Sequence, residues 1–204
     1  MVEPVIESGP VVRPRAKPMV TLVGGSLVRW VLARFKGADR TGTAILHTAD
    51  PQRAMIVFAA MEVLVTPLVG RLLPGVWQLV HLVVEVLVVG VYLGLAACWR
   101  IHPHLLDDRS LLLRTGTFGD VAIPLTAIEA VRRDERAAGG YGIRGVADEQ
   151  ETLACSVTSQ TNVVIDLVRS YPFQAKDGVL SARHIRFSVN EPGDFTRLLG
   201  KALS

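Results

Sequence analysis

Two long apolar runs, separated by a short turn, are the feature that most restricts how this chain can fold. The runs extend from Ala54 to Leu73 and from Gly75 to Cys98, and the turn is Arg71-Leu72-Leu73-Pro74-Gly75. A helix needs roughly 20 apolar residues to cross the hydrocarbon of a bilayer, and each run has about that length. Neither run alternates apolar and polar residues as a barrel strand does, so its backbone must satisfy itself as a helix. Residues 54–99 are therefore predicted to form a transmembrane helical hairpin.

Basic residues are concentrated before the hairpin. Residues 1–53 carry eight Lys or Arg against four Asp or Glu, whereas residues 101–204 carry twelve against thirteen. Basic residues flank both outer ends of the hairpin, while the turn offers only Arg71. Because basic residues near span ends favour the cytoplasm, we expect a multi-pass protein of the plasma membrane with both termini cytoplasmic. The balanced charge after the hairpin gives no support for a nucleic-acid partner.

The region before the hairpin divides into two parts. Residues 1–18 contain four prolines and no apolar core of a secretory signal, so we expect a disordered cytoplasmic tail. Residues 19–53 are interpreted as an amphipathic basic segment with a helix near its start. This helix either lies on the anionic leaflet or packs on the soluble domain, and a third span is disfavoured because the run is short and interrupted. On the leaflet, membrane lipids would contact its basic residues Arg29, Arg34, Lys36 and Arg40.

From Ile101 onward the periodicity changes from that of helices to that of strands. Ile185, Phe187 and Val189 alternate with polar residues, as on a half-buried antiparallel strand. We expect further strands over residues 110–114, 118–124, 128–133, 141–147, 153–157 and 162–168. Such short strands predict an antiparallel barrel or sandwich. A helical stripe predicts a C-terminal helix that closes the barrel, with these residues in the core: Phe195, Leu198, Leu199, Ala202 and Leu203.

Two short motifs in this region resemble the opening of the bacterial pleckstrin-homology-like (PH-like) domains. Residues 111–116 read Leu-Leu-Leu-Arg-Thr-Gly, similar to the L-x-x-R-x-G strand of that family. Residues 121–131 match its I-P-L-x-x-I-x-x-V strand at Ile123, Pro124, Leu125, Ile128 and Val131. The ending, Glu191-Pro192 followed by a helix with Phe195, is also similar.

The resemblance implies an α+β membrane protein in which a transmembrane hairpin precedes a small antiparallel PH-like barrel, residues 101–204, on the cytoplasmic side. Eukaryotic members that bind phosphoinositides concentrate Lys and Arg around the loop between their first two strands. Here that loop, residues 115–119, has no basic residue. A phosphoinositide pocket is therefore not expected.

Ionisable residues inside the apolar runs are the strongest candidates for a functional site. Such groups are costly in hydrocarbon and mark function by default. Glu62 and Glu85 lie at similar distances from the turn, His81 shares a helix face with Glu85, and Thr66 should lie opposite His81. The four residues could form a proton- or metal-binding cluster or a buried hydrogen-bond network. Since two helices cannot enclose such groups, we expect a homo-oligomer or a membrane-protein partner.

The soluble region offers little for catalysis. It contains no nucleophile elbow, zinc-protease, redox or phosphate-loop motif. His102 and His104, which flank Pro103, could bind a metal ion, but we interpret them as part of an interfacial linker. We expect no cofactor and no small-molecule substrate. The preferred hypothesis is a non-catalytic, membrane-anchored interaction or scaffold protein. The alternative is an accessory subunit of a transport or envelope-assembly complex that uses the intramembrane residues.

Overall fold

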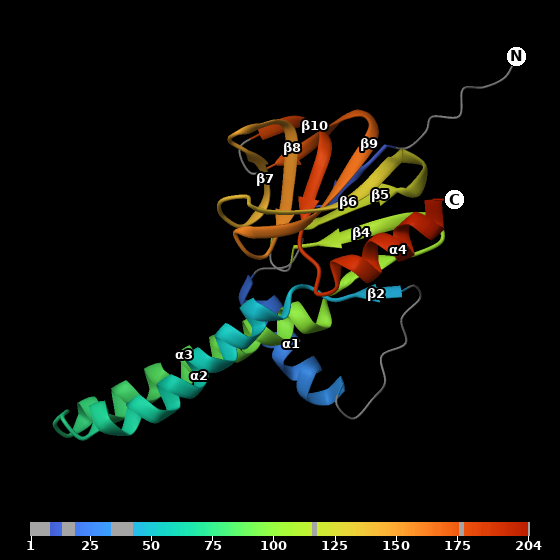
Figure 1. Cartoon of the computed structure of the whole chain (residues 1–204). Helices are drawn as coiled ribbons and strands as arrows, with labels where there is room; N and C mark the ends of the chain where they lie inside the picture. The colour runs from blue at the N-terminus through green and yellow to red at the C-terminus, as the bar shows by residue number, and fades with distance from the viewer. Residues whose placement is uncertain (1–8, 14–18, 34–42, 116–117, 176–177, 204) are drawn as a thin grey trace, which may run out of the picture. The chain divides into compact units, whose positions relative to one another are not determined.

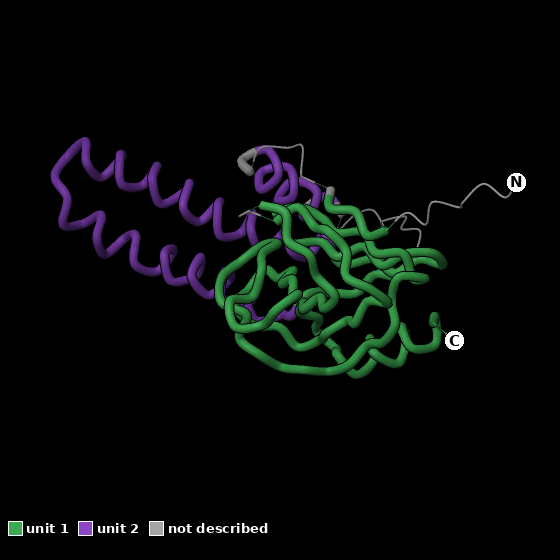
Figure 2. Tube along the Cα trace, turned by 90° about the horizontal axis from the view of Figure 1, so that it is seen from above, with its two compact units in different colours: residues 1–16, 40–47, 103–204 green, residues 17–39, 48–102 purple. Residues whose placement is uncertain are grey.

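The structure, a computed structural model, describes residues 9–13, 19–33, 43–115, 118–175 and 178–203. They form two compact units, which Figure 2 draws in different colours. The sheet unit comprises the described parts of residues 1–16, 40–47 and 103–204, and the helical unit those of 17–39 and 48–102. The fold is α+β with two long apolar helices, in agreement with the sequence prediction.

The first sheet has the strand order β1-β5-β4-β3-β2, with every neighbouring pair antiparallel. The buried residues Leu111, Leu113, Val121 and Ile123 alternate with less buried ones along β4 and β5, as the sequence pattern requires. The strands are β1 (Val11–Arg13), β2 (Thr43–Ile45), β3 (His104–Leu106), β4 (Ser110–Arg114) and β5 (Asp120–Pro124).

The second sheet has the order β6-β9-β10-β8-β7 and is mixed, because β10 runs parallel to β8 while the other neighbours are antiparallel. A short 3-10 turn, η1 (Leu125–Ala127), leads from the first sheet into the second. The strands are β6 (Ile128–Ala137), β7 (Gly142–Val146), β8 (Glu149–Ser156), β9 (Gln160–Ala175) and β10 (Gly178–Phe187).

Within the described residues the strands form two separate sheets and not the closed barrel that we expected. Each sheet retains two edges, β1 and β2 in the first and β6 and β7 in the second. A single hydrophobic core nevertheless contains residues of both sheets, including Leu113 of β4, Ile165 of β9 and Phe187 of β10. Alternating burial predicts the inward face of each strand, but it does not show whether the outermost strands join.

Strands β1 and β2 come from the region before the hairpin. β1 pairs with β5, and β2 pairs with β3, so that Ile45 lies opposite His104. Residues 11–13 thus form a strand inside the stretch that we expected to be disordered, and the remainder of that stretch up to residue 18 lies largely outside the described residues. Three-residue strands are too short to show a periodicity, which explains why the sequence pattern placed the start of the unit near residue 101.

The helical unit contains α1 (Met19–Ala33), α2 (Ala49–Gly70) and α3 (Val76–Ile101). Figure 1 shows α2 and α3 side by side and antiparallel, joined by the predicted turn. Helix α1 packs on α3 with Leu22, Val23 and Ser26 buried. The two helices approach closely at Gly94, where an added Cβ would lie 2.4 Å from Val23 Cγ1. The glycine is therefore required by the packing.

The C-terminal helix α4 (Pro192–Leu203) packs on the sheet unit, in contact with β6 and η1. Phe195 and Leu199 are buried as predicted, and the Phe195 ring lies edge-on to Phe187 with 5.4 Å between centroids. Leu198 is 38 % exposed and Ala202 is exposed, so these two residues do not belong to the core as we expected. The buried stripe follows the i, i+4 positions alone and is narrower than the sequence suggests.

Candidate functional site

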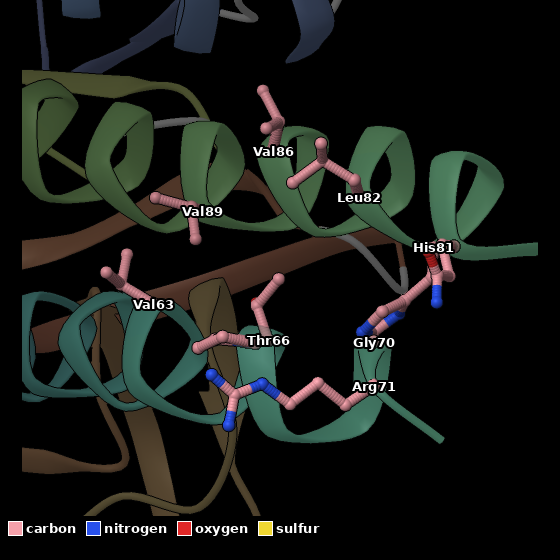
Figure 3. Close-up of a pocket in the computed structure, with 10 residues that line it drawn as sticks. Val63, Thr66, Gly70, Arg71, His81, Leu82, Val86 and Val89 are labelled. Carbon is pink, nitrogen blue, oxygen red and sulfur yellow. The ribbon is translucent and has the colours of Figure 1, made fainter. Parts of the chain in front are cut away.

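The hairpin contains a pocket of about 630 Å³ near its turn, between α2 and α3. Figure 3 labels lining residues of both helices, with Val63 and Thr66 on α2 and Leu82, Val86 and Val89 on α3. The end nearer the turn is polar. The full lining is Val63, Thr66, Pro67, Gly70, Arg71, Gln78, His81, Leu82, Val86 and Val89.

His81 and Glu85 form a pair on one face of α3. His81 Nδ1 lies 3.5 Å from Glu85 Oε1, in the i, i+4 relation that brings side chains of a helix together. Both side chains are more than four-fifths buried. Among the described residues, neither His81 Nε2 nor Glu85 Oε2 has a hydrogen-bond partner. A buried polar atom without a partner carries a desolvation penalty, so this pair is a candidate for binding a proton or a small polar ligand.

The other two predicted cluster residues are placed differently. Thr66 lines the pocket, as His81 does, but its hydroxyl donates a hydrogen bond of 2.6 Å to the backbone oxygen of Glu62. Such a bond within one helix satisfies the hydroxyl locally. Glu62 does not line the pocket, and its carboxylate makes no hydrogen bond or ion pair to another described residue. The structure therefore brings His81 and Glu85 together. Thr66 lines the same pocket as His81, whereas Glu62 does not.

Arg71 is the pocket residue that the sequence reasoning missed. The sequence pattern uses this residue only to orient the hairpin, because it lies in the turn. In Figure 3 its side chain extends from the turn back along α2 towards Thr66. Residues of a helix point their side chains towards its N-terminus, and at the end of α2 that direction leads into the hairpin. The signal in the sequence is a single cation directly after an apolar helix.

The predicted membrane-surface segment is only partly described. Arg29 is exposed on α1, whereas Arg34, Lys36 and Arg40 lie outside the described residues. The buried face of α1 packs on α3 within the helical unit, a contact that the sequence did not predict. The apolar side chains Val28 and Leu32 of α1 remain exposed.

The sheet unit holds a network of ion pairs that periodicity does not reveal. Its centre is Arg186 of β10, whose side chain is 4 % exposed and bonds Glu149 of β8 at 2.7 Å and Asp134 of β6 at 2.8 Å. Arg136 bonds Glu149 at 3.2 Å, and a second branch joins Arg132 to Asp166 at 3.1 Å. His184 Nδ1 lies 2.6 Å from Asp166. The polar side of β10, which the sequence pattern assigned to solvent, is therefore partly buried.

The charges of this network set the protonation of its acids. The hydrogen bond from Arg186 lowers the pKa of Asp134 and that of Glu149, and burial opposes the shift. Burial raises the pKa of Asp166, but the bonds from Arg132 and His184 outweigh it, and the net shift is downward. All three acids are thus held ionised beside permanent cations. In this network none of the three acids is an unpaired base or a protonated acid of the kind that acid–base catalysis uses.

His104 is a structural residue of the sheet unit. The Arg114 backbone N–H donates to His104 Nδ1 at 3.0 Å, so Nε2 carries the proton and donates to the Ser188 oxygen at 3.2 Å. Both ring nitrogens are thereby used. Burial, reinforced by the adjacent His47 ring, holds the pKa of His104 well below its usual range.

No group of three or more His, Cys, Asp or Glu side chains in the described part of the chain is arranged to hold a metal ion. Comparisons with family models, with curated proteins and with solved structures find no match to the chain. The functional argument therefore rests on the geometry of the two units.

Proposed function

We propose that this protein is a non-catalytic interaction protein, anchored in the membrane by its hairpin, with the sheet unit on the cytoplasmic side. Two helices, α2 and α3, are long and apolar enough to cross a membrane. Only 6 % and 11 % of their most apolar windows are buried, so the hairpin is not the core of a soluble fold. Apolar surface of that extent requires lipid or a partner to cover it.

The observation that carries the proposal is the pairing of β2 with β3. These strands directly precede and follow the α2–α3 hairpin, and their register places Thr43 opposite Leu106 and Ile45 opposite His104. The chain thus leaves one sheet, passes through two apolar helices, and returns to the same sheet. A membrane crossed on the way must be crossed twice, which agrees with two spans.

Aromatic and basic residues fit this arrangement. Trp77 and Trp99 lie near the two ends of α3, 22 residues or about 33 Å apart along a helix. Indole rings favour the two interfaces of a bilayer whose hydrocarbon is about 30 Å thick. Arg53 and Arg100 lie near the hairpin ends that connect in sequence to β2 and β3, whereas Arg71 lies at the turn. This bias favours a cytoplasmic sheet unit.

The same connectivity argues that α1 does not cross the membrane. It is preceded by β1 and followed by β2, and both strands belong to the first sheet. A single crossing between them would place two strands of one sheet on opposite sides. Its 15 residues are also fewer than the roughly 20 that a span needs. We propose that α1 lies at the interface, with Val28 and Leu32 towards lipid.

The proposed partner of the sheet unit is a protein, bound beside two exposed aromatic residues. Phe118 lies before β5 and Tyr141 before β7, and they are 54 % and 62 % exposed. Phe118 lies against the backbone of Gly142, the neighbour of Tyr141, since a Cβ added to that glycine would meet its ring at 3.0 Å. Aromatic residues are enriched in protein interfaces. Phe118 and Tyr141 therefore lie on neighbouring segments, and these two residues are called the aromatic patch.

The test separates anchoring from interaction. Membranes containing the full chain are washed with alkaline carbonate, and the retained protein is then purified in mild detergent with its partners. We expect the chain to stay in the washed membrane and to retain the same partner at constant ratio. Phe118→Ala with Tyr141→Ala should release that partner, whereas Val179→Ala, at an exposed residue of β10, should not. Extraction by carbonate would contradict the anchor, and a partner held equally by all variants would contradict the patch.

A second function, as an accessory subunit of a transport complex, is favoured by one observation. His81 Nε2 and Glu85 Oε2 are buried without partners among the described residues. In such a complex they would exchange protons or ions with a larger partner. Glu85→Gln should then abolish an ion-dependent phenotype while the complex remains intact, and Glu62→Gln, which is not paired with His81, should have a smaller effect. Equal loss of the complex in both variants would count against this role.

A further inference from the structure

We propose that the pocket between α2 and α3 is a binding site for a phospholipid with an anionic headgroup, in the leaflet on the side of the turn. The inference rests on the proposed membrane-spanning role of the hairpin. The site would hold the headgroup at Arg71 and one acyl chain along the apolar wall that continues towards the middle of the span. It gives Arg71 a role that neither anchoring nor protein interaction requires.

The lining of the pocket changes from polar to apolar along the helices. Arg71, Gln78 and His81 lie at the end near the turn, and Val63 and Val89 lie farthest from it. Eight residues separate Val63 from Arg71, which corresponds to about 12 Å along a helix, and eleven separate Gln78 from Val89, about 16 Å. One leaflet of hydrocarbon is about 15 Å thick. The pocket thus has the polarity and the length of a single lipid.

Arg71 supplies charge complementarity. Its guanidinium has no ion pair or side-chain hydrogen bond to any other described residue, although its side chain extends along the pocket towards Thr66. Arg71 is exposed in the turn, at the end of the hairpin where a headgroup would lie. Guanidinium groups bind phosphate through two parallel hydrogen bonds. A basic residue at the membrane surface attracts anionic lipids.

The remaining polar groups are compatible with an anion at this end. Gln78 Nε2 donates to the Leu73 oxygen at 2.9 Å, and so stabilises the turn that places Arg71. The His81 ring carries an N–H that can donate a hydrogen bond to an acceptor. The two nearby acids, Glu62 and Glu85, do not line the pocket, and the carboxylate of Glu85 faces His81. Arg71 is thus the charged residue of the lining.

The experiment compares two brominated lipids as quenchers of Trp77, which is exposed near the turn. The full chain, with Trp30→Phe and Trp99→Phe so that Trp77 alone fluoresces, is reconstituted in phosphatidylcholine vesicles. Brominated phosphatidylglycerol or brominated phosphatidylcholine is then added in increasing proportion. We expect phosphatidylglycerol to bind about fivefold more strongly, the ratio that corresponds to roughly 1 kcal/mol for one basic residue at a membrane surface.

Arg71→Gln keeps a polar side chain that can donate a hydrogen bond but removes the charge, so the ratio should fall to about one. Arg71→Lys should restore most of the preference. Arg100→Gln is the matched control, because it removes an exposed cation from the other end of α3 and should leave the ratio at Trp77 unchanged. Equal quenching by both lipids in the unsubstituted pocket, or a preference that survives Arg71→Gln, would overturn the lipid site.

Vesicle flotation distinguishes this failure from failure of the proposed anchor. A chain that floats with the vesicles, and whose Trp77 is quenched by both lipids, is inserted whatever its preference. A chain that does not float, or whose Trp77 neither lipid quenches, would refute the membrane-spanning hairpin and the lipid site with it.

Discussion

Two cation environments differ between the units, since Arg186 is buried and Arg71 is exposed. Arg186 of the sheet unit lies between Asp134 and Glu149, with bonds of 2.8 Å and 2.7 Å, whereas Arg71 of the hairpin has no acidic partner in the described structure. The histidines differ in the same way, because His104 uses both ring nitrogens and His81 leaves Nε2 unpaired. Arg186 is thus paired with acids of its own unit, although its Nη1 has no hydrogen-bond partner among the described residues. Arg71 has no such acidic partner in the described part of the hairpin.

Substituting Arg186 tests the ion-pair network of the sheet unit and should have the largest effect on stability. Arg186→Met removes the buried cation between Asp134 and Glu149, each about four-fifths buried, and leaves them the more exposed Arg136. Breaking a buried ion pair from one side typically costs about 3–5 kcal/mol. The control Arg132→Met removes a cation that is 51 % exposed and should cost less than about 1 kcal/mol.

The thiol of Cys155 provides the measurement for both variants. Cys155 is buried in the sheet unit, and burial raises its pKa to about 12, so the folded thiol does not react. In a Cys98→Ala background, the alkylation of Cys155 in urea therefore reports opening of the sheet unit. Similar urea midpoints for the Arg186 and Arg132 variants would show that the network does not hold this unit together.

Substituting the α4 residue that packs in the core should lower the stability of the sheet unit by a similar amount. Phe195→Ala removes a buried ring that packs on Phe187, and truncations of this kind cost about 3–5 kcal/mol. Arg197→Ala, which removes an exposed partner of Asp194, should barely move the urea midpoint of Cys155 exposure. If Phe195→Ala released a bound protein without any loss of stability, α4 would be an interaction surface and not part of the core.

The helical unit can be tested at Gly94 with a smaller expected effect. Gly94→Ala places a Cβ 2.4 Å from Val23 Cγ1 and 3.2 Å from the Val23 oxygen, and overpacking of this kind costs about 1–3 kcal/mol. Gly90→Ala meets no atom within 4 Å and serves as the control. The reactivity of a Ser26→Cys thiol, buried in α1, should rise in the first variant and stay low in the second. Equal protection in both would show that α1 does not depend on this contact.

The pH dependence of the sheet unit should have two phases. The pKa of His104 is lowered on folding, so the unfolded chain takes up its proton first and stability falls as the pH drops below 6.5. The pKa values of Asp134 and Glu149 are also lowered, so their contribution is lost only below their ordinary values of 3.8 and 4.5. His104→Gln should remove the first phase from the urea midpoint of Cys155 exposure, whereas Arg186→Met should weaken the second. A first phase retained in the His104 variant would assign it to another group.

The sequence predicted the elements whose patterns are long and repetitive. The apolar runs of α2 and α3, the alternation along β4 and β5, and the helix that buries Phe195 and Leu199 are all present in the structure. Each of these patterns repeats several times along one element, so a single misplaced residue does not hide it.

Other features depend on partners far away in the chain. Strand β1 has three residues, and its identity follows from pairing with β5, more than 100 positions later. Arg186 alternates as a surface residue would, and only the positions of Asp134 and Glu149 show that it is buried. The pocket likewise requires Arg71 to point back along α2, which depends on the geometry of the turn. Periodicity carries no information about such long-range contacts.

The central claim, that the hairpin crosses a membrane and returns to the sheet unit, is tested most directly by the accessibility of two engineered thiols. Leu72→Cys lies in the turn and Val179→Cys on β10, at residues that are 84 % and 71 % exposed, while the native Cys98 and Cys155 are buried. Intact cells are treated with a membrane-impermeant maleimide before and after permeabilisation. We predict that the Leu72→Cys thiol reacts in intact cells and that the Val179→Cys thiol reacts only after permeabilisation. Reaction of both thiols under the same condition, or of Val179→Cys first, would contradict the account.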